Sequence, residues 1–397
     1  MKQLASAVGV LLSTLAMFAL LVRLQPFDLA STLLDRAFHA PPKWTQVADL
    51  FRDPDTQELS RGDHPLESFA LLSKYWTAHP KPKRVVFIGN SQMQAITLAP
   101  GEAPYAAPGK TYVDLIADRC RLDDRFLVYR LSAGGMSYEE ALWYVYYLLS
   151  VPELKPDAIV FQINYQFFWQ GGIRDGMLEL LKHTGFREKI ERAAGEAQPY
   201  AESFGESLAR FRNIGHTSSA GQSDASPPAE SGGAGLAGAL ENAVRDRLVN
   251  VPGFNRRPEQ KESFLQMLYR IRLYILRVTP GSARSISGVR LLRSQACVEA
   301  VAQLCHENHV RLMLFHAPLN PEAKLYLTAH DKQAHYDFVN GLAARYQLPV
   351  GAFEEAIPSQ YWGRMLNGPD PLHLGRTGHK MLAEMIFNMI AKNVGGD

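Results

Sequence analysis

The chain of 397 residues has little cysteine and almost no net charge, and both shortages exclude classes of protein. Its three cysteines are too few and odd in number for a disulfide framework. Cys297 and Cys305 are expected on one helix, too far apart to bridge each other, so only a bond to Cys120 stays open. The 42 basic and 40 acidic residues leave a net charge of +2 with no basic stripe, so no nucleic-acid partner is expected. His306 and His309, close to Cys305, lack the spacing of zinc ligands, and we predict neither a metal nor another cofactor.

An uncharged segment of mostly Leu, Ala and Val, from Leu4 to Val22, is the first feature along the chain. At about 1.5 Å per residue, such a run of roughly twenty residues nearly crosses the hydrocarbon layer of a membrane. We therefore expect an uncleaved, single-pass anchor in the cytoplasmic membrane, with the rest of the chain on its outer, periplasmic side. The alternative is a cleaved signal peptide, although the small residues at 37–40 lie far from the apolar run for ordinary cleavage.

Apolar strand-like runs alternate with helix-like segments over much of the remaining chain. The expected strands are 84–88, 126–131, 158–163 and 310–315. The expected helices are 112–120, 138–150, 295–308 and 375–392. Because buried strands that alternate with helices are typical of a parallel sheet covered on both faces, the sequence predicts an α/β fold. With 46% apolar and 21% charged residues, the chain has enough apolar side chains for a substantial core.

The same pattern suggests a domain organisation. We expect an anchor over residues 1–24, a proline-containing neck over 25–83, and a catalytic domain made of 84–174 and 291–397. Residues 175–290 are expected to form a helical insertion, in which 215–239 are rich in Gly, Ser, Ala and Pro and read as a flexible linker. This insertion is either a lid or docking surface, or a solvent-facing elaboration without a specific role.

Two segments far apart in the sequence carry the parts of a serine nucleophile and its base. Ser91 follows the apolar run 85–88, where we expect a strand to give way to a helix whose N–H groups surround the hydroxyl. Asp370 precedes His373 by three residues, on an expected loop that runs into the last helix. A histidine in this position can take the serine proton while the aspartate orients the imidazole. Taken separately, the pair also fits a helix cap and a surface histidine.

Two further positions after predicted strands fit an oxyanion hole. Gly135 follows the strand that ends at Leu131, where a glycine lets the backbone N–H approach a substrate. Asn164 follows the next strand, where its side-chain amide can donate to the same oxygen. Alone, each position also fits an ordinary turn. Because ligands bind beyond the carboxyl ends of strands in open α/β sheets, we expect these residues to meet Ser91 there.

The four short segments that contain Ser91, Gly135, Asn164 and the pair Asp370 and His373 resemble the sequence motifs of the SGNH hydrolase superfamily, also called GDSL-like. The resemblance implies a three-layer, flavodoxin-like parallel sheet, with Ser91 as the nucleophile and Asp370 and His373 completing the triad. It also implies an oxyanion hole made by the backbone of Ser91, by Gly135 and by Asn164. The chain departs from common members at three positions. It has Asn90 and Tyr165 where those members have Asp, and Arg130 where they often have Asn.

With its apolar N-terminal run, the chain resembles membrane-tethered members that work beside membrane-bound O-acyltransferases in teichoic-acid D-alanylation and alginate acetylation. That resemblance implies O-acylation of a cell-surface polysaccharide or polymer, with a membrane-bound O-acyltransferase as partner. One alternative is a carbohydrate esterase or lipase, and another is a scaffold that binds a glycan or partner without turnover. The run Phe167, Phe168 and Trp169 either lines an acyl or sugar site or packs in the interior.

Overall fold

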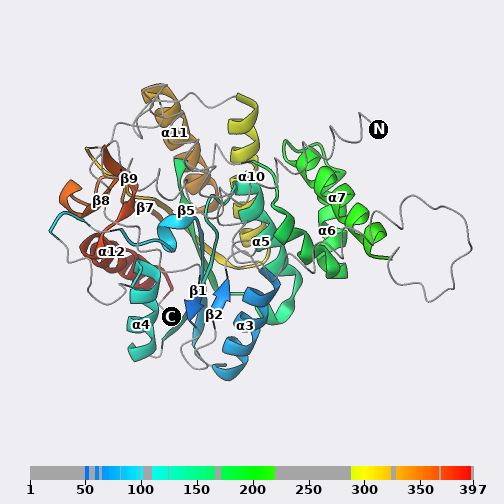
Figure 1. Ribbon diagram of the computed structural model, residues 1–397, viewed down its shortest axis with the longest axis horizontal. Coiled ribbons are helices and arrows are strands. Elements are labelled where there is room, and N and C mark those ends of the chain that lie inside the picture. Colours follow the sequence, from blue (N-terminus) through cyan, green and yellow to red (C-terminus); the bar gives the residue numbers. More distant parts are fainter. Residues whose placement is uncertain are drawn as a thin grey trace, which may run out of the picture. The chain divides into compact units, whose positions relative to one another are not determined.

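Five parallel strands form the centre of the computed structural model (Figure 1). They are β3 (Lys83–Gly89), β4 (Phe126–Ser132), β5 (Ala158–Ile163), β6 (Arg311–His316) and β7 (Val350–Ala352). Their order in the sheet is β4-β3-β5-β6-β7, and every neighbouring pair is parallel. Taken in chain order this is 2-1-3-4-5, a doubly wound arrangement whose switch point lies between the first and third strands, β3 and β5. The predicted α/β fold with a parallel sheet is confirmed.

The structure describes residues 50–52, 59–61, 65–80, 82–97, 99–101, 110–123, 125–165, 171–219, 288–322, 328–365 and 368–394. All of them belong to one compact unit, which spans residues 42–221 and 280–397. The expected anchor, most of the 215–239 linker and the aromatic run at 167–169 lie outside the described residues. None of the helices that the structure describes is long and apolar enough to cross a membrane.

Side chains of the central strands alternate between two apolar cores, one on each face of the sheet. On β3, Val86 and Ile88 enter one core, whereas Val85 and Phe87 enter the other. This period of two is what a strand buried on both faces requires. The first core is covered by α3 (Pro65–Ala78), α5 (Tyr138–Ser150) and α10 (Gly288–Glu307), and the second by α4 (Tyr112–Asp123) and α12 (Arg376–Val394), on opposite sides of the sheet in Figure 1.

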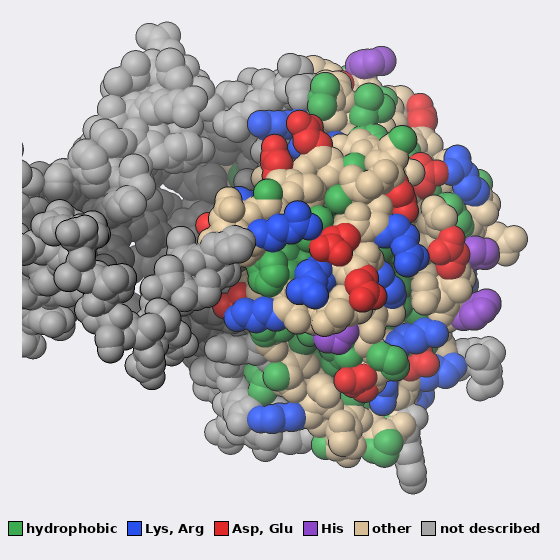
Figure 2. All heavy atoms as spheres, turned by 90° about the vertical axis from the view of Figure 1, so that its right-hand side faces the viewer, with side chains coloured by type: hydrophobic (Ala, Val, Ile, Leu, Met, Phe, Trp, Pro, Cys, Tyr) green, Lys and Arg blue, Asp and Glu red, His purple; other side chains and the backbone are tan. Residues whose placement is uncertain are grey.

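The first core extends outward through η4 (Asp175–Lys182), α6 (Thr184–Ala194) and α7 (Ala201–Ser219). Trp143 of α5 makes edge contacts with Phe186 of α6 and Phe204 of α7. The helix α11 (Ala329–Tyr346) contributes Val339 and Leu342 to the same core. Beyond this core, acidic and basic side chains are interspersed on the face shown in Figure 2.

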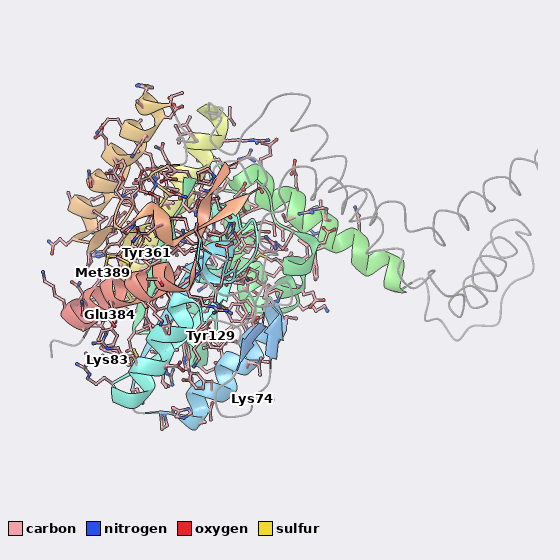
Figure 3. All side chains as sticks on the ribbon, turned by 60° about the vertical axis from the view of Figure 1, so that its left-hand side comes forward. Lys74, Lys83, Tyr129, Tyr361, Glu384 and Met389 are labelled. Atoms are coloured by element: carbon pink, nitrogen blue, oxygen red, sulfur yellow. The ribbon has the colours of Figure 1, made fainter. Side chains whose placement is uncertain are left out.

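Hydrogen bonds from Lys83 and Tyr129, which are labelled in Figure 3, join covering helices to the sheet. On one side Lys83 donates to the carbonyl of Val394 in α12 at 2.9 Å. On the other side the hydroxyl of Tyr129 in β4 donates to the carbonyl of Ser68 in α3 at 2.8 Å. The helix α3 lies within the range that we assigned to a neck, and its Trp76 is 1% exposed.

Short elements complete the described chain. Two antiparallel pairs lie outside the main sheet, namely β1 (Leu50–Arg52) with β2 (Leu59–Arg61), and β8 (Trp362–Met365) with β9 (Gly368–Leu374). Three-residue 3-10 turns are η1 (Ser91–Met93), η2 (Pro152–Leu154) and η5 (Ser359–Tyr361). Asp370 and His373, which we placed on a loop that runs into the last helix, lie on the strand β9 instead. That expectation was wrong because β9 forms a strand by pairing with β8, and no local sequence pattern indicates this pairing.

Candidate active site

Ser91 lies directly beyond β3, at the switch point of the sheet, and its side chain is half-buried. Because Gly89 has no side chain, the side chains of Gln162 and Met93 can pack closely against its backbone. A Cβ on Gly89 would come within 2.4 Å of both Gln162 Oε1 and Met93 Cε. The glycine therefore leaves room for a buried amide beneath the nucleophile.

The helix that we expected after Ser91 is only the three-residue turn η1, so that expectation was wrong. The chain beyond the turn pairs with the histidine-bearing strand instead of continuing as a helix. Thr97 N–H donates to the Leu374 carbonyl at 3.0 Å, and Thr97 Oγ1 donates to the His373 carbonyl at 3.0 Å. These two bonds tie the nucleophile segment to β9, and the distance between Ser91 and His373 depends on them.

A continuous chain of hydrogen bonds joins the predicted serine, histidine and aspartate. Ser91 Oγ lies 3.1 Å from His373 Nε2, and His373 Nδ1 lies 3.2 Å from each carboxylate oxygen of Asp370. With a proton on Nδ1 facing the carboxylate, Nε2 accepts from the hydroxyl and can take its proton. The structure thus brings together all three residues in the order that nucleophilic catalysis needs.

The carboxylate of Asp370 is fully buried, and backbone donors hold it in place. Its Oδ1 accepts from the N–H of Leu372 at 2.9 Å and from the N–H of His373 at 3.0 Å. Asn320 Nδ2 donates to the Asp370 carbonyl at 3.0 Å, which fixes the residue from the other side. These contacts fix the carboxylate with both of its oxygens facing His373 Nδ1.

Two buried amide side chains next to Ser91, those of Gln92 and Gln162, link the segment after β3 to β5, to β9 and to the segment after β6. Gln92 Nε2 donates to the carbonyls of Pro318 at 3.0 Å and Leu372 at 2.8 Å. Gln92 Oε1 accepts from Gln162 Nε2 at 2.6 Å, and Gln162 Oε1 accepts from Asn90 N–H at 3.0 Å. Sequence reasoning assigned no role to Gln92 or Gln162. Their polar side chains beside buried apolar strands were the available signal.

The two predicted oxyanion positions lie at the same edge of the sheet as Ser91. In the register of β3, Ile88 pairs with Leu131 of β4 and with Phe161 of β5. Ser91 is three residues beyond Ile88, and Asn164 is three residues beyond Phe161 and 1% exposed. Gly135 is four residues beyond Leu131 and has a φ of 65°, a left-handed conformation that favours glycine.

Arg130 of β4 is hydrogen-bonded to the turn that carries Ser91. It is 6% exposed and donates through Nη1 to the Met93 carbonyl at 2.7 Å and to Thr111 Oγ1 at 3.3 Å. Its Nη1 lies 3.7 Å from Asp114 Oδ1, which supplies a partner for the buried charge. A charged residue inside a buried strand was the only sequence signal for this role.

A buried histidine borders the nucleophile segment on the α12 side. His379 Nδ1 accepts from Tyr112 N–H at 3.2 Å, so Nε2 carries the proton and donates to the Ala95 carbonyl at 3.1 Å. Burial lowers the pKa of His379 from 6.5 to about 4. This histidine therefore stays neutral, and its two ring nitrogens link α4 to the segment after Ser91 through hydrogen bonds.

A polar cluster formed with Glu354 and Lys332 holds Tyr165, the residue that follows Asn164. Tyr165 donates its hydroxyl to Glu354 Oε2 at 2.9 Å, and Lys332 Nζ lies 2.6 Å from Glu354 Oε1. Burial and the neighbouring Glu354 raise the pKa of Tyr165. His316, at the end of β6, is 3% exposed, and burial lowers its pKa to about 4. The cluster fixes the backbone after β5 by contacts that sequence reasoning did not find.

No model of a protein family matches the chain, and no curated protein matches it. Similar solved structures include an acetylxylan esterase from Geobacillus stearothermophilus, with 12% identity, a TM-score of 0.36, and 78% of this chain and 94% of that one covered. The esterase EstA from Pseudoalteromonas sp. has 8% identity and a TM-score of 0.38, with 79% and 100% covered. A lipase/acylhydrolase from Enterococcus faecalis has 12% identity and a TM-score of 0.33, with 78% and 96% covered. Because none of the three TM-scores exceeds 0.38, only the geometry of the site supports a statement about its chemistry.

Proposed function

We propose that the chain is a serine esterase of the SGNH type, in which Ser91 carries the acyl group during turnover. One observation carries this proposal, namely the hydrogen-bonded chain from Ser91 Oγ through His373 to a fully buried Asp370. A histidine hydrogen-bonded to a serine hydroxyl on one nitrogen and to a buried carboxylate on the other is the arrangement that activates serine for acyl transfer.

The reaction follows from these contacts in two halves. His373 Nε2 takes the proton of Ser91 as Oγ attacks the ester carbonyl carbon, and the carbonyl oxygen becomes an oxyanion. The C–O bond to the leaving alcohol then breaks, and that alcohol takes the proton from His373. Water attacks the acyl-serine in the same way, which releases the acid and restores the hydroxyl. We assign the oxyanion to the N–H groups of Ser91 and Gly135 and the amide of Asn164.

For the substrate we favour an O-acyl ester of a carbohydrate, such as an acetylated polysaccharide. Acyl transfer to a cell-surface polymer, beside a membrane-bound O-acyltransferase, is the second candidate. The observation that favours it is the uncharged run Leu4–Val22, which has the length of one membrane crossing and would hold the enzyme on the outer side of the cytoplasmic membrane. Hydrolysis and transfer share the acyl-serine and differ in whether water or a sugar hydroxyl attacks it.

Labelling of Ser91 tests the proposed function directly. The full chain is treated with a fluorophosphonate, and the labelled peptide is identified by mass spectrometry. We expect one adduct, on Ser91, that is lost in Ser91→Ala and strongly reduced in His373→Ala. An adduct on another residue would contradict the assignment of the nucleophile. A protein that reacts with neither a fluorophosphonate nor any activated ester would support the non-catalytic scaffold instead.

A chain that begins near residue 30 and is exported by a cleavable signal separates the two candidates. Because Leu4–Val22 supplies no catalytic group, we expect Ser91 to stay reactive towards a small activated ester. If the enzyme transfers acyl groups from a membrane-bound donor, the truncation lowers polymer acylation in cells, since the donor is no longer held nearby. Full polymer modification at low expression would refute the tethered-partner proposal and favour the free esterase.

A further inference from the structure

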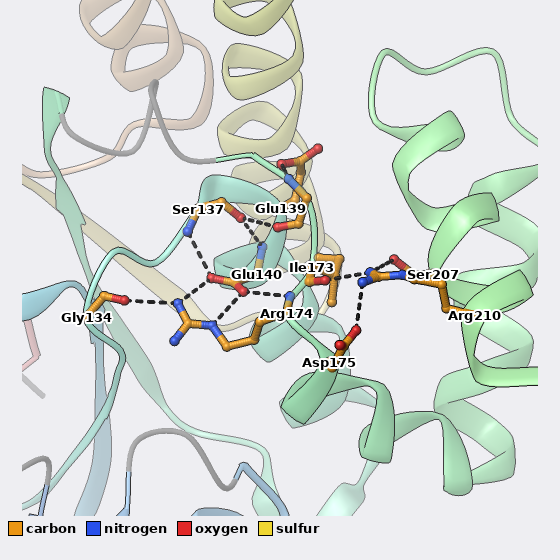
Figure 4. Close-up of polar contacts among 10 residues, drawn as sticks. Gly134, Ser137, Glu139, Glu140, Ile173, Arg174, Asp175, Ser207 and Arg210 are labelled. Carbon is orange, nitrogen blue, oxygen red and sulfur yellow. Dashed lines mark hydrogen bonds and ion pairs between the residues drawn. The ribbon is translucent and has the colours of Figure 1, made fainter. Parts of the chain in front are cut away.

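A largely buried ion pair joins the turn that carries Gly135 to the segment that follows Asn164 (Figure 4). Glu140, in the first turn of α5, is 3% exposed. Its Oε1 accepts from the backbone N–H of Arg174 at 2.9 Å and from Arg174 Nε at 2.7 Å. Its Oε2 accepts from Arg174 Nη2 and from Ser137 N–H, both at 3.0 Å. One carboxylate therefore holds four N–H groups from two loops.

The same guanidinium reaches the turn itself. Arg174 Nη2 also donates to the carbonyl oxygen of Gly134 at 3.1 Å. That carbonyl belongs to the same planar peptide unit as the N–H of Gly135, and in a trans peptide the two point in opposite directions. A donor fixed on the carbonyl side therefore sets the direction of the Gly135 N–H on the other side. Both residues of this peptide are glycines, which restrict its rotation least.

A charged donor on the carbonyl also changes the strength of the N–H. Hydrogen bonds in a chain polarise one another, so a cation on the Gly134 oxygen makes the Gly135 N–H a better donor. The segment around Arg174 is held by two more bonds, because Gly172 N–H donates to Glu139 Oε2 at 2.8 Å and Ser137 Oγ donates to the Gly172 carbonyl at 3.0 Å. Arg174 thus belongs to a fixed frame rather than to a free surface side chain.

We propose that Arg174 and Glu140 form a positioning pair, which aims and polarises the Gly135 N–H toward the oxyanion. This inference rests on the proposed function, because it assumes that Gly135 is an oxyanion donor. Neither residue touches the reacting atoms. Removal of one oxyanion donor lowers kcat roughly 10²- to 10³-fold, so loss of its orientation alone should lower kcat by about 10- to 100-fold, with KM nearly unchanged.

Three variants separate positioning from folding. Arg174→Met removes the donor to Gly134 but leaves Glu140 buried without its partner. The double variant Arg174→Met with Glu140→Gln removes that uncompensated charge. Arg174→Lys keeps a cation beside Glu140 but loses the planar fork that holds Glu140 and the Gly134 carbonyl together. We expect each of these variants that folds to show a lower kcat with KM preserved. In a fourth variant, Arg174→Ala, we expect added methylguanidinium to restore part of the lost kcat.

Arg210→Met is the matched control. Arg210 donates to Asp175 and to the carbonyl of Ile173, beside Arg174, but makes no bond to Gly134 or Glu140 (Figure 4). We expect its kcat to stay within about threefold of the wild type, as for most surface substitutions.

Fluorophosphonate labelling keeps this inference distinct from the proposed function. If the wild-type Ser91 is not labelled, the proposed function fails. If the wild type is labelled and the double variant or Arg174→Lys turns over esters at the wild-type kcat, the proposed function stands and the positioning pair is refuted. A loss that appears in KM rather than kcat, or an equal loss in Arg210→Met, would also refute it.

Discussion

The variant Asp370→Asn tests the central chain of hydrogen bonds with little change in shape. In the native site, Oδ1 of Asp370 accepts from two backbone N–H groups, and both carboxylate oxygens lie 3.2 Å from His373 Nδ1. The asparagine oxygen can keep the two backbone donors at the Oδ1 position. Its NH₂ group then faces Nδ1, so a donor meets a donor unless the imidazole moves its proton to Nε2. In that tautomer Nε2 cannot accept the Ser91 proton.

The expected magnitude follows from the loss of the general base. Proton transfer by a positioned base contributes roughly 10²- to 10⁴-fold, so Asp370→Asn should lower kcat by that factor. This corresponds to about 3 to 5 kcal/mol of transition-state free energy. The free energy of unfolding should change little, since the buried backbone donors keep an acceptor. Asp370→Ala removes that acceptor from both N–H groups, which should destabilise the fold by about 1 to 3 kcal/mol for each.

Initial rates of p-nitrophenyl acetate hydrolysis and urea denaturation measure the two quantities separately. His373→Ala, which removes the base itself, should be less active than Asp370→Asn. An Asp370→Asn enzyme with an undiminished kcat would refute the role of Asp370 as the orienting acid. A loss of stability in Asp370→Asn as large as that in Asp370→Ala would refute the account of the backbone donors.

Two further outcomes follow from buried groups around the site. Gly89→Ala should destabilise the fold by about 1 to 3 kcal/mol, since its Cβ would overlap Gln162 Oε1, and equal urea midpoints would contradict this. Stability should fall as pH drops below 6.5, because the unfolded chain protonates His316, His379 and the buried His335 of α11, whereas burial lowers their folded pKa values to about 4, 4 and 3. Each contributes a loss of about 1.4 kcal/mol per pH unit between 6.5 and its folded pKa, and an unchanged slope between pH 6.5 and 5 in His379→Gln would contradict this.

The sequence predicted the sheet and its nearest helices because their signals are local. The buried strand Ala158–Ile163 and the helix Tyr138–Ser150 have the predicted bounds. The helix begins at a capping box, in which Ser137 and Glu140 satisfy each other's backbone N–H groups, so a four-residue pattern in the sequence specifies its start. By contrast, β7 has only three residues and forms a strand through its pairing with β6, so the sequence did not predict it.

The parts of the site that were missed depend on contacts between residues far apart in the chain. Arg174 reaches Gly134 across 40 residues, and Gln92 reaches Leu372 across 280. No periodicity or spacing encodes such pairs, because each partner alone is an ordinary polar residue beside a strand or turn. The chemistry-bearing residues Ser91 and His373 were accessible to sequence reasoning since short motifs mark them, but their supporting contacts were not.

The contacts that position His373, the proposed base, differ from those that stabilise the fold. His373 lies on β9, a strand paired with β8 outside the central sheet, so the parallel sheet does not itself set the distance from Ser91 to His373. That distance is set by the bonds from Thr97 to the backbone of β9 and from Gln92 to Leu372. These are a few hydrogen bonds, whereas the two apolar cores on either side of the sheet contain most of the buried hydrophobic side chains that the structure describes. The geometry of the triad is therefore more easily disturbed than the fold that carries it.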